Sequence, residues 1–408
     1  VTLCIPTAFC AYNGLALDKK TPLLKSAEAV DKQAMRILKL FGNHTTKKIN
    51  ATAGAEQEYF LIDRDLYKER QDLQITGRTL FGARPPKAQE MDDHYFGTLK
   101  ERVSCFMREL DEELWKMGVY AKTEHNEAAP AQHELAPVFT DVNVATDHNQ
   151  LIMETLKRVA AHHHFACLLH EKPFDGVNGS GKHNNWSLST DDGMNLLDPG
   201  KTPEDNAQFL LFLCAVMKAV DEFPGLLRAS AASAGNEHRL GGFEAPPAII
   251  SMFLGEQLTE ILNRIERGEH AEPASKSKLE IPVAAIPNLS TDSTDRNRTS
   301  PFAFTGNKFE FRMVGSSASI AGPNTVINTI VAHELKQFAD LLERADNFET
   351  ALQDLLRRTI REHKRIIFNG NGYSSEWIRK AEAQGFPNIT NSVDAYREYI
   401  TDKAIQVF

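Results

Sequence analysis

The stretch Ala-Glu-Gln-Glu-Tyr-Phe-Leu-Ile-Asp at positions 55–63 decides the fold expected for this chain. It is rich in aromatic and aliphatic residues, which predicts a β-strand. Because side chains alternate between the two faces of a strand, Glu56 and Glu58 should point to the same side. Two adjacent carboxylates repel each other unless a cation or a proton lies between them. The apolar run that follows indicates a central strand, so the sequence predicts a cation site on an interior sheet.

Two further segments add groups of the same chemical kind. Glu127 and Glu134 lie seven positions apart, and Pro130 between them interrupts any helix. Two strand edges joined by a tight connection would aim both carboxylates at one point. The stretch Phe-Glu-Phe-Arg at 309–312 places Glu310 and Arg312 on one strand face. Taken singly, these residues also fit solvent-exposed glutamates and a surface salt bridge.

A Gly-rich segment, Asn-Gly-Ser-Gly-Lys-His-Asn-Asn-Trp-Ser at 178–187, predicts a turn that runs into a strand. Its glycines allow the backbone to approach a ligand closely, although the spacing of a P-loop is absent. His183 within it fits either a metal ligand or a core histidine. The triplet at 162–164 consists of three histidines inside an apolar helical pattern, and we interpret it as structural.

Carboxylates with one histidine suit Mg²⁺ or Mn²⁺, which are hard cations that prefer oxygen ligands. Such metals commonly hold substrate phosphates, so the pattern predicts phosphate chemistry on a small molecule. The formal net charge of -9 over 408 residues argues against a nucleic-acid partner. No apolar run reaches the roughly 18 residues of a membrane span. The five cysteines are odd in number and lack a CxxC pair, which favours a reduced, cytoplasmic setting.

Apolar periodicity predicts helices separated by short strands. We expect helices over residues 23–41, 95–118, 144–171, 205–223, 248–267 and 325–368. A strand-like stretch is expected at 119–124, and a polar loop or flap at 268–300. The absence of regular βαβ alternation favours an α+β fold.

Together, these motifs resemble glutamine synthetase, and in particular its long bacterial type III class. The resemblance rests on five stretches in family order, which are 56–63, 125–134, 178–187, Arg-Leu-Gly-Gly-Phe-Glu-Ala-Pro at 239–246, and Asn-Lys-Phe-Glu-Phe-Arg at 307–312. It implies a catalytic domain with a curved, mainly antiparallel sheet that lines the active site, surrounded by helices. It also implies an entry segment at 1–50 after a small β-grasp domain, a catalytic domain at 51–322, and a C-terminal helical region at 323–408. Members of this class extend beyond both ends of the chain, so we expect it to be part of a longer protein.

The resemblance assigns roles to individual residues. A metal nearer glutamate and ammonia would be held by Glu58, Glu127 and Glu134. A metal nearer the ATP phosphates would be held by Glu56, His183 and Glu310. Glutamate would be held by Asn178, Gly179, Arg239 and Arg312. Nucleotide contacts would come from Asn185, Ser187 and Lys308, and catalytic contacts from the flap residue Glu244, the phosphate-contacting Arg298, and Tyr95 at the ammonium pocket.

The activity implied is the ATP-dependent ligation of ammonia to L-glutamate, which gives L-glutamine, ADP and phosphate through γ-glutamyl phosphate. The cofactors implied are ATP and two or more Mg²⁺ or Mn²⁺ ions per site. The expected assembly is a large homo-oligomer of stacked rings with active sites between subunits. Two alternatives stay open, namely a γ-glutamyl ligase for a larger amine and a non-catalytic structural relative.

Overall fold

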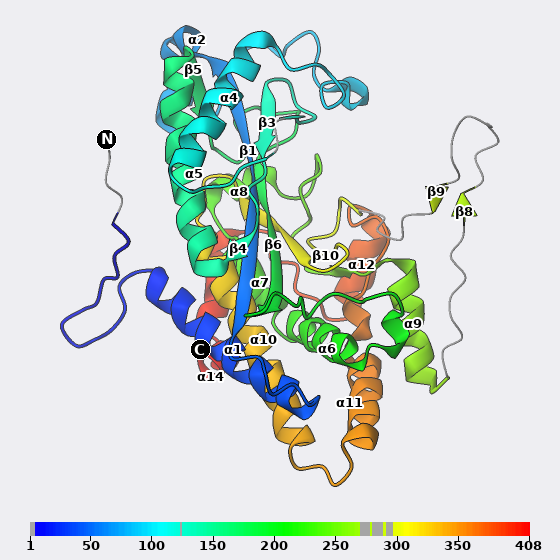
Figure 1. Cartoon of the computed structure of the whole chain (residues 1–408). Coiled ribbons are helices and arrows are strands. Elements are labelled where there is room, and N and C mark those ends of the chain that lie inside the picture. Colours follow the sequence, from blue (N-terminus) through cyan, green and yellow to red (C-terminus); the bar gives the residue numbers. More distant parts are fainter. Residues whose placement is uncertain (1–4, 123–124, 270–277, 280–288, 291–296) are drawn as a thin grey trace.

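The computed structural model describes residues 5–122, 125–269, 278–279, 289–290 and 297–408 (Figure 1). Most of the loop expected at 268–300, and the last two residues of the strand-like stretch at 119–124, therefore lie outside the described residues. The described part contains no helix that is both long enough and apolar enough to cross a membrane.

The strands are short except for two in the middle of the sheet. Their bounds are β1 Ile49–Asp63, β2 His125–Asn126, β3 Gln132–Leu135, β4 Thr140–Asp141, β5 Phe165–Leu168, β6 Gly181–Thr190, β7 Met252–Phe253, β8 Lys278–Leu279, β9 Leu289–Ser290, β10 Phe302–Phe304 and β11 Phe309–Gly315. The α-helices are α1 Lys20–Leu40, α2 Arg64–Glu69, α3 Gln71–Thr76, α4 Glu101–Lys116, α5 Val142–His162, α6 Ala207–Glu222, α7 Pro224–Ser230, α8 Ala234–Arg239, α9 Gly255–Arg267, α10 Ala321–Leu342, α11 Phe348–His363, α12 Ser375–Ala383, α13 Ser392–Arg397 and α14 Asp402–Val407. Short 3₁₀ turns are η1 Glu90–Asp92, η2 Pro203–Asp205, η3 Lys364–Ile366 and η4 Glu398–Ile400.

One open sheet organises the described residues. Its strand order is β2-β3-β1-β6-β11-β10-β7, and β4 and β5 pair with the two ends of β1. Its pairings are antiparallel except that of β10 with β7. In Figure 1, β1 and β6 run side by side through the molecule, with α4 and α5 along one side and α6, α9 and α11 towards one end. The α+β expectation is confirmed.

The long strand β1 separates the two larger hydrophobic cores from the functional face. On one face, Ile49, Ala51, Ala53 and Ala55 belong to the main core together with α1, α6 and α10. Further along the same face, Tyr59 and Leu61 belong to a second core with α4 and α5. Burying side chains of this kind contributes about 1.5–3 kcal/mol for each large one, which holds β1 firmly between helices. The alternate residues, including both glutamates, therefore point to the opposite face.

Several predicted element bounds were wrong. The helix expected to continue to residue 171 ends at His162, because His164 adopts a left-handed φ of +55° and β5 follows. The histidine triplet is structural as expected, since His162 and His163 contact Glu109 at 2.8 and 2.7 Å. The predicted helix at 325–368 is two helices, α10 and α11, separated near Asp346. Likewise, the pattern at 248–267 contains β7 before α9 begins.

The start of the second predicted helix also differs. It was expected from residue 95, whereas α4 begins at Glu101. The stretch at 119–122 forms only an isolated bridge, between Ala121 and Pro137. The division into segments 1–50, 51–322 and 323–408 stays a prediction.

Candidate functional site

Strand register brings the predicted metal ligands together. Across the sheet, His125 faces Glu134, and Glu134 faces Glu58 on β1. Glu56 faces His183 on the next strand, β6. Adjacent strands lie about 4.8 Å apart, so these side chains are near neighbours although they are far apart in the sequence.

Strand β11 and the β2–β3 hairpin contribute the two remaining predicted metal ligands, Glu310 and Glu127. Glu310 on β11 faces Asn185, two positions from His183 on β6. Glu127 follows β2, and its backbone N–H donates to the carbonyl of Gln132 at 2.9 Å, which closes the hairpin. The expected tight connection between Glu127 and Glu134 is confirmed.

A cavity of about 280 Å³ opens over this face of the sheet. Its lining consists of Glu56, Glu58, Tyr95, His125, Glu127, Glu134, Ala136, Asn178, His183, Arg239, Phe243, Glu244, Ala245, Arg298, Glu310 and Arg312. All six predicted metal ligands are among them, which confirms their convergence. Among the described residues, the predicted site positions outside the lining are Gly179, Asn185, Ser187 and Lys308.

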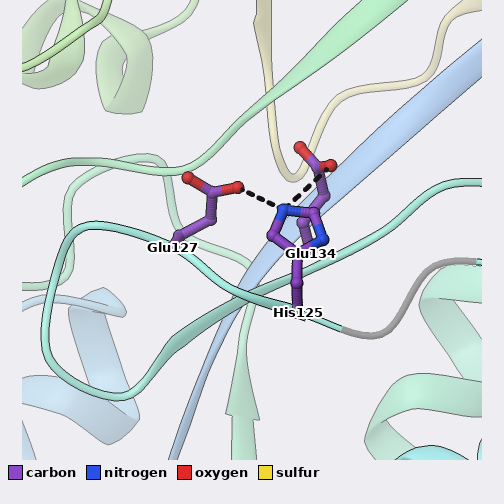
Figure 2. A group of neighbouring side chains, drawn as sticks. All are labelled: His125, Glu127 and Glu134. Atoms are coloured by element: carbon purple, nitrogen blue, oxygen red, sulfur yellow. Dashed lines mark hydrogen bonds and ion pairs between the residues drawn. The ribbon is translucent and has the colours of Figure 1, made fainter. Parts of the chain in front are cut away.

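His125 is a site residue that sequence reasoning missed. Figure 2 shows its ring between the carboxylates of Glu127 and Glu134, with Nε2 2.9 Å from Glu127 Oε1 and 3.5 Å from Glu134 Oε1. Ligand atoms of these three residues all lie within 4.8 Å of one another. The ring of Tyr95 packs edge-on against His125, with centroids 5.8 Å apart. The available signal was proximity, because His125 stands two residues before Glu127 in a motif already singled out.

The carboxylates crowd one another in a poorly hydrated place. Burial raises the pKa of Glu134 well above its usual value, and Glu56, Glu127, Glu58 and Glu310 raise it further. Burial and the nearby Glu127 also raise the pKa of Glu58. A site of this kind favours the binding of protons or cations.

The same carboxylates also raise the pKa of His183, because they stabilise its charged form. Burial disfavours its charged form, but Glu56, whose Oε2 lies 3.1 Å from Nδ1, and Glu58 together outweigh burial, and the pKa of His183 is raised. The histidine and the carboxylate thus hold each other's orientation.

Arg312 lines the cavity, yet its guanidinium is already engaged. Its Nε and one terminal nitrogen donate to Glu310 Oε2 at 3.1 and 2.9 Å. Another terminal nitrogen donates to the carbonyl of Asn297. Arg239 is buried beside it and donates to the carbonyls of Arg312 and Met313 at 3.2 and 3.5 Å. Both arginines therefore fix β11 as well as face the cavity.

The segment 178–181 lies tightly against the site. The N–H of Gly181 donates to Glu58 Oε2 at 2.7 Å, which orients this carboxylate. A Cβ on Gly179 would stand 2.2 Å from the carbonyl oxygen of Glu171, so only glycine fits there. The side chain of Gln89 holds Asn178 by two hydrogen bonds, to its backbone N–H and to its Oδ1.

The loop at 241–246 closes one side of the cavity. Glu244 accepts a hydrogen bond from Asn178 Nδ2 at 2.8 Å and contacts the guanidinium of Arg298. Phe243 and Glu244 have φ values of +52° and +65°, which are unfavourable for residues with a Cβ. Tyr373 donates from its hydroxyl to the carbonyl of Ala245 at 2.7 Å and holds the loop in this state. The loop thus combines a strained backbone with a small number of side-chain anchors.

The predicted nucleotide positions continue along β6 and β11 away from the segment 178–181. Asn185 Nδ2 donates to Glu56 Oε1 at 2.9 Å, while its buried Oδ1 has no hydrogen-bond partner in the described structure. Ser187 Oγ lies within hydrogen-bond distance of Asn195 Oδ1 and the carbonyl of Asn307. Lys308 Nζ lies 3.4 Å from the carbonyl of Thr305. None of the three positions is part of the cavity lining, and Asn185 contacts it through Glu56.

Comparison with known proteins identifies the family. A family model described as "Glutamine synthetase, catalytic domain" matches residues 33–252, more than half of the chain. The chain belongs to the glutamine synthetase family. Models described as "Glutamine synthetase C-terminal domain" and "Glutamine synthetase type III N terminal" match residues 351–408 and 1–26. These matches confirm the resemblance found in the sequence, including its class.

Individual relatives agree with this placement. The chain is 52% identical to a glutamine synthetase of Butyrivibrio fibrisolvens over 100% of its own length and 58% of the relative's. It is 50% identical to the type-3 glutamine synthetase of Dictyostelium discoideum over 100% of the chain and 56% of that protein. The chain thus spans somewhat more than half the length of the curated relatives that it matches.

A solved glutamine synthetase from Plasmodium falciparum has the same fold. It superposes with a TM-score of 0.56 at 14% identity, covering 98% of this chain and 81% of that one. The sheet and surrounding helices are therefore those of the glutamine synthetase family. The site that this fold carries is complete in its predicted metal ligands, even though Glu310 lies beyond the catalytic-domain match.

Proposed function

We propose that this chain carries the catalytic region of an ATP-dependent ligase that joins ammonia to L-glutamate, giving L-glutamine, ADP and phosphate through γ-glutamyl phosphate. One observation carries the proposal. Four strands of a glutamine synthetase fold and the connection between β2 and β3 bring Glu56, Glu58, Glu127, Glu134, His183 and Glu310 to one cavity. Identities of about half with proteins named glutamine synthetase support it.

The donor set fits Mg²⁺ or Mn²⁺. Carboxylate oxygens with one or two histidine nitrogens match the preference of both ions, and the crowding that raises the pKa of Glu134 is relieved by a bound cation. Glu58, Glu127 and Glu134, with His125 beside them, would hold one ion. Glu56, His183 and Glu310 would hold a second. When bound, such ions neutralise phosphate charge during phosphoryl transfer.

The remaining residues divide into a glutamate side and a nucleotide side. We assign glutamate binding to the residues around the buried arginine pair, namely Asn178, Gly179, Arg239 and Arg312. Nucleotide contacts are assigned to Asn185, Ser187 and Lys308, and a phosphate contact to Arg298. The buried Oδ1 of Asn185, which has no partner in the described structure, supports a ligand at that position.

Glu244 and Tyr95 act on the ammonium side in this proposal. Glu244 shields the acyl phosphate from water and is one candidate to take a proton from ammonium. The guanidinium of Arg298 lies 5.7 Å from the centre of the Tyr95 ring and also contacts Glu244. These three residues therefore form one part of the cavity wall. Excluding water matters because the acyl phosphate hydrolyses if water reaches it.

We also propose that the protein works in the cytoplasm as a large homo-oligomer of stacked rings with its active sites between subunits. The unpaired cysteine pattern supports the location. Met91 and Phe96, which are close to Tyr95 in the sequence, expose apolar side chains. This exposure supports a neighbouring subunit that covers the cavity near Tyr95.

The test uses the full-length protein, with ATP, Mg²⁺ and L-glutamate, and with ammonia or a larger amine. Glutamine and phosphate should form in equal amounts with ammonia, and Glu134→Gln should abolish both. A product that forms only with a larger amine would support a γ-glutamyl ligase instead. No ATP-dependent product from any amine would support a non-catalytic relative.

A further inference from the structure

Two buried side chains, Lys182 and Glu171, form hydrogen bonds with the turn at residues 315–318. Lys182 on β6 is fully buried, and its Nζ donates to the carbonyl of Ser316 and to that of Ala318, the latter at 2.5 Å. Glu171, which is 2% exposed, accepts from the N–H of Ser317 at 3.1 Å and from its hydroxyl at 2.5 Å. The lysine nitrogen thus donates to backbone carbonyls, and the carboxylate accepts from a backbone N–H and a hydroxyl.

The surroundings of Glu171 are shaped to receive its carboxylate. A Cβ on Gly315 would lie 2.5 Å from Glu171 Oε1, and a Cβ on Gly235 would lie 2.2 Å from Oε2. Real Cβ atoms do not approach other heavy atoms this closely, so both positions require glycine while Glu171 is in place. A lysine and a glutamate rarely occupy such buried positions unless they have specific partners.

The turn is connected to the functional face by two short routes. In the first, Ser316 Oγ donates to the backbone carbonyl of Glu58 at 2.7 Å. In the second, the carbonyl of Glu171 accepts from the N–H of Ser180 at 2.8 Å, and the next residue, Gly181, donates to Glu58 Oε2 at 2.7 Å. Both routes end on Glu58, one at its backbone and one at its carboxylate.

We propose that Lys182 and Glu171 are positioning residues, which set the orientation of the Glu58 carboxylate by holding the 315–318 turn and the 178–181 segment. The proposal rests on the proposed function, in which Glu58 is a metal ligand. Neither side chain is part of the cavity lining, so we assign neither a contact with substrate or metal. Partners that orient a metal ligand typically change metal affinity about 10- to 100-fold when they are removed.

Three substitutions separate positioning from simple stability. Lys182→Met shortens the side chain by one atom and removes the hydrogen bonds of Nζ to the carbonyls of Gly315, Ser316 and Ala318. Glu171→Ala removes the acceptor of Ser317, whereas Glu171→Gln retains one. A matched control is Lys218→Met, because Lys218 Nζ lies 2.7 Å from the fully buried Glu334, between α6 and α10 and outside the cavity lining.

The measurement is titration of the full-length protein with Mn²⁺ alone, followed by electron paramagnetic resonance. We expect one Mn²⁺-binding step to weaken by about 10- to 100-fold in Lys182→Met and in Glu171→Ala. Glu171→Gln should recover most of the affinity. Lys218→Met should lower the melting temperature and leave the Mn²⁺ affinity as in the wild type.

Amide hydrogen exchange supplies a readout that requires no metal and no turnover. Lys182→Met and Glu171→Ala should accelerate exchange at residues 178–182 and 315–318, and Lys218→Met should not. The proposal would be overturned if Lys182→Met and Glu171→Ala exchanged at the wild-type rate in both segments. It would also be overturned if these two variants were folded and bound Mn²⁺ within twofold of the wild-type affinity. Should Lys182→Met fail to fold, the two Glu171 variants decide. A wild-type protein that forms no glutamine would refute the proposed function, and the exchange and Mn²⁺ results would still judge the positioning role.

Discussion

Replacing Arg312 by lysine tests whether the planar guanidinium matters beyond its charge. In the structure, Arg312 donates twice to Glu310 Oε2, at 3.1 and 2.9 Å, and once more to the carbonyl of Asn297. Lysine carries the same charge on one nitrogen, and its geometry does not match two parallel contacts with a carboxylate. At least one charge-assisted hydrogen bond is therefore lost, which costs about 1.5–3 kcal/mol.

In the proposed function Arg312 also holds the substrate glutamate, so a hydrogen bond of this strength that is lost from the transition state lowers the rate. At about 1.36 kcal/mol for each factor of ten, kcat/KM for glutamate should fall about 10- to 160-fold in Arg312→Lys. The assay is steady-state glutamine formation by the full-length protein at saturating ATP and ammonia, with glutamate varied. Circular dichroism and thermal melting should show that the variant is folded.

Arg36 provides a matched control for this substitution. Its Nε and a terminal nitrogen donate to the two oxygens of Glu343 at 2.8 and 2.6 Å, so it too binds one carboxylate through two nitrogens, but outside the cavity lining. Arg36→Lys should leave kcat/KM unchanged, because exposed ion pairs contribute only about 0–1 kcal/mol and this one touches nothing in the site. An Arg312→Lys enzyme with kcat/KM within twofold of the wild type would remove Arg312 from the glutamate site.

Three other outcomes are expected. Glu244→Ala should still release phosphate from ATP but form less glutamine per phosphate, since shielding and proton removal both weaken; a one-to-one ratio at the wild-type rate would exclude this role. His125→Ala should weaken Mn²⁺ binding by about tenfold, as measured by calorimetry, whereas the surface variant His162→Ala should not; equal affinities would show that His125 is not part of the site. In the presence of EDTA, the wild-type protein should lose thermal stability relative to the Glu134→Gln variant as the pH rises above about 4.5. The reason is that the pKa values of Glu58 and Glu134 are raised, so the folded state binds more protons than the unfolded state. Added Mg²⁺ should flatten this decline, and a pH-independent difference without metal would contradict the reasoning.

Local rules were enough to predict which side chains share a face. Alternation along 55–63 placed Glu56 and Glu58 together, and the helix-breaking Pro130 correctly implied the hairpin that joins Glu127 to Glu134. Local rules were not enough to place β11 beside β6, because that pairing joins residues more than 120 positions apart. The pattern at 309–312 placed Glu310 on a strand face, but its grouping with Glu56 and His183 came from the resemblance to a family.

Element ends were predicted less well for a physical reason. Apolar periodicity continues past His162, but His164 takes a left-handed conformation and the chain turns back to pair β5 with β1. That reversal is dictated by tertiary pairing, which a helical pattern does not reveal. His125 was overlooked because a strand of only two residues leaves no alternation from which to orient its side chain.

The sequence also contains a signal, weaker than that of the metal ligands, for the positioning residues Lys182 and Glu171. Lys182 interrupts an otherwise small and β-prone segment, and local propensity alone would place it in solvent. In the structure it is fully buried and bound to backbone carbonyls. A residue that breaks a local rule at no visible gain often marks a functional site or its support. The glycines at 235 and 315 carry the complementary signal, because each leaves room for the buried carboxylate of Glu171. A buried charge together with glycines that make space for it is thus a pattern by which supporting residues can be sought in other members of the family.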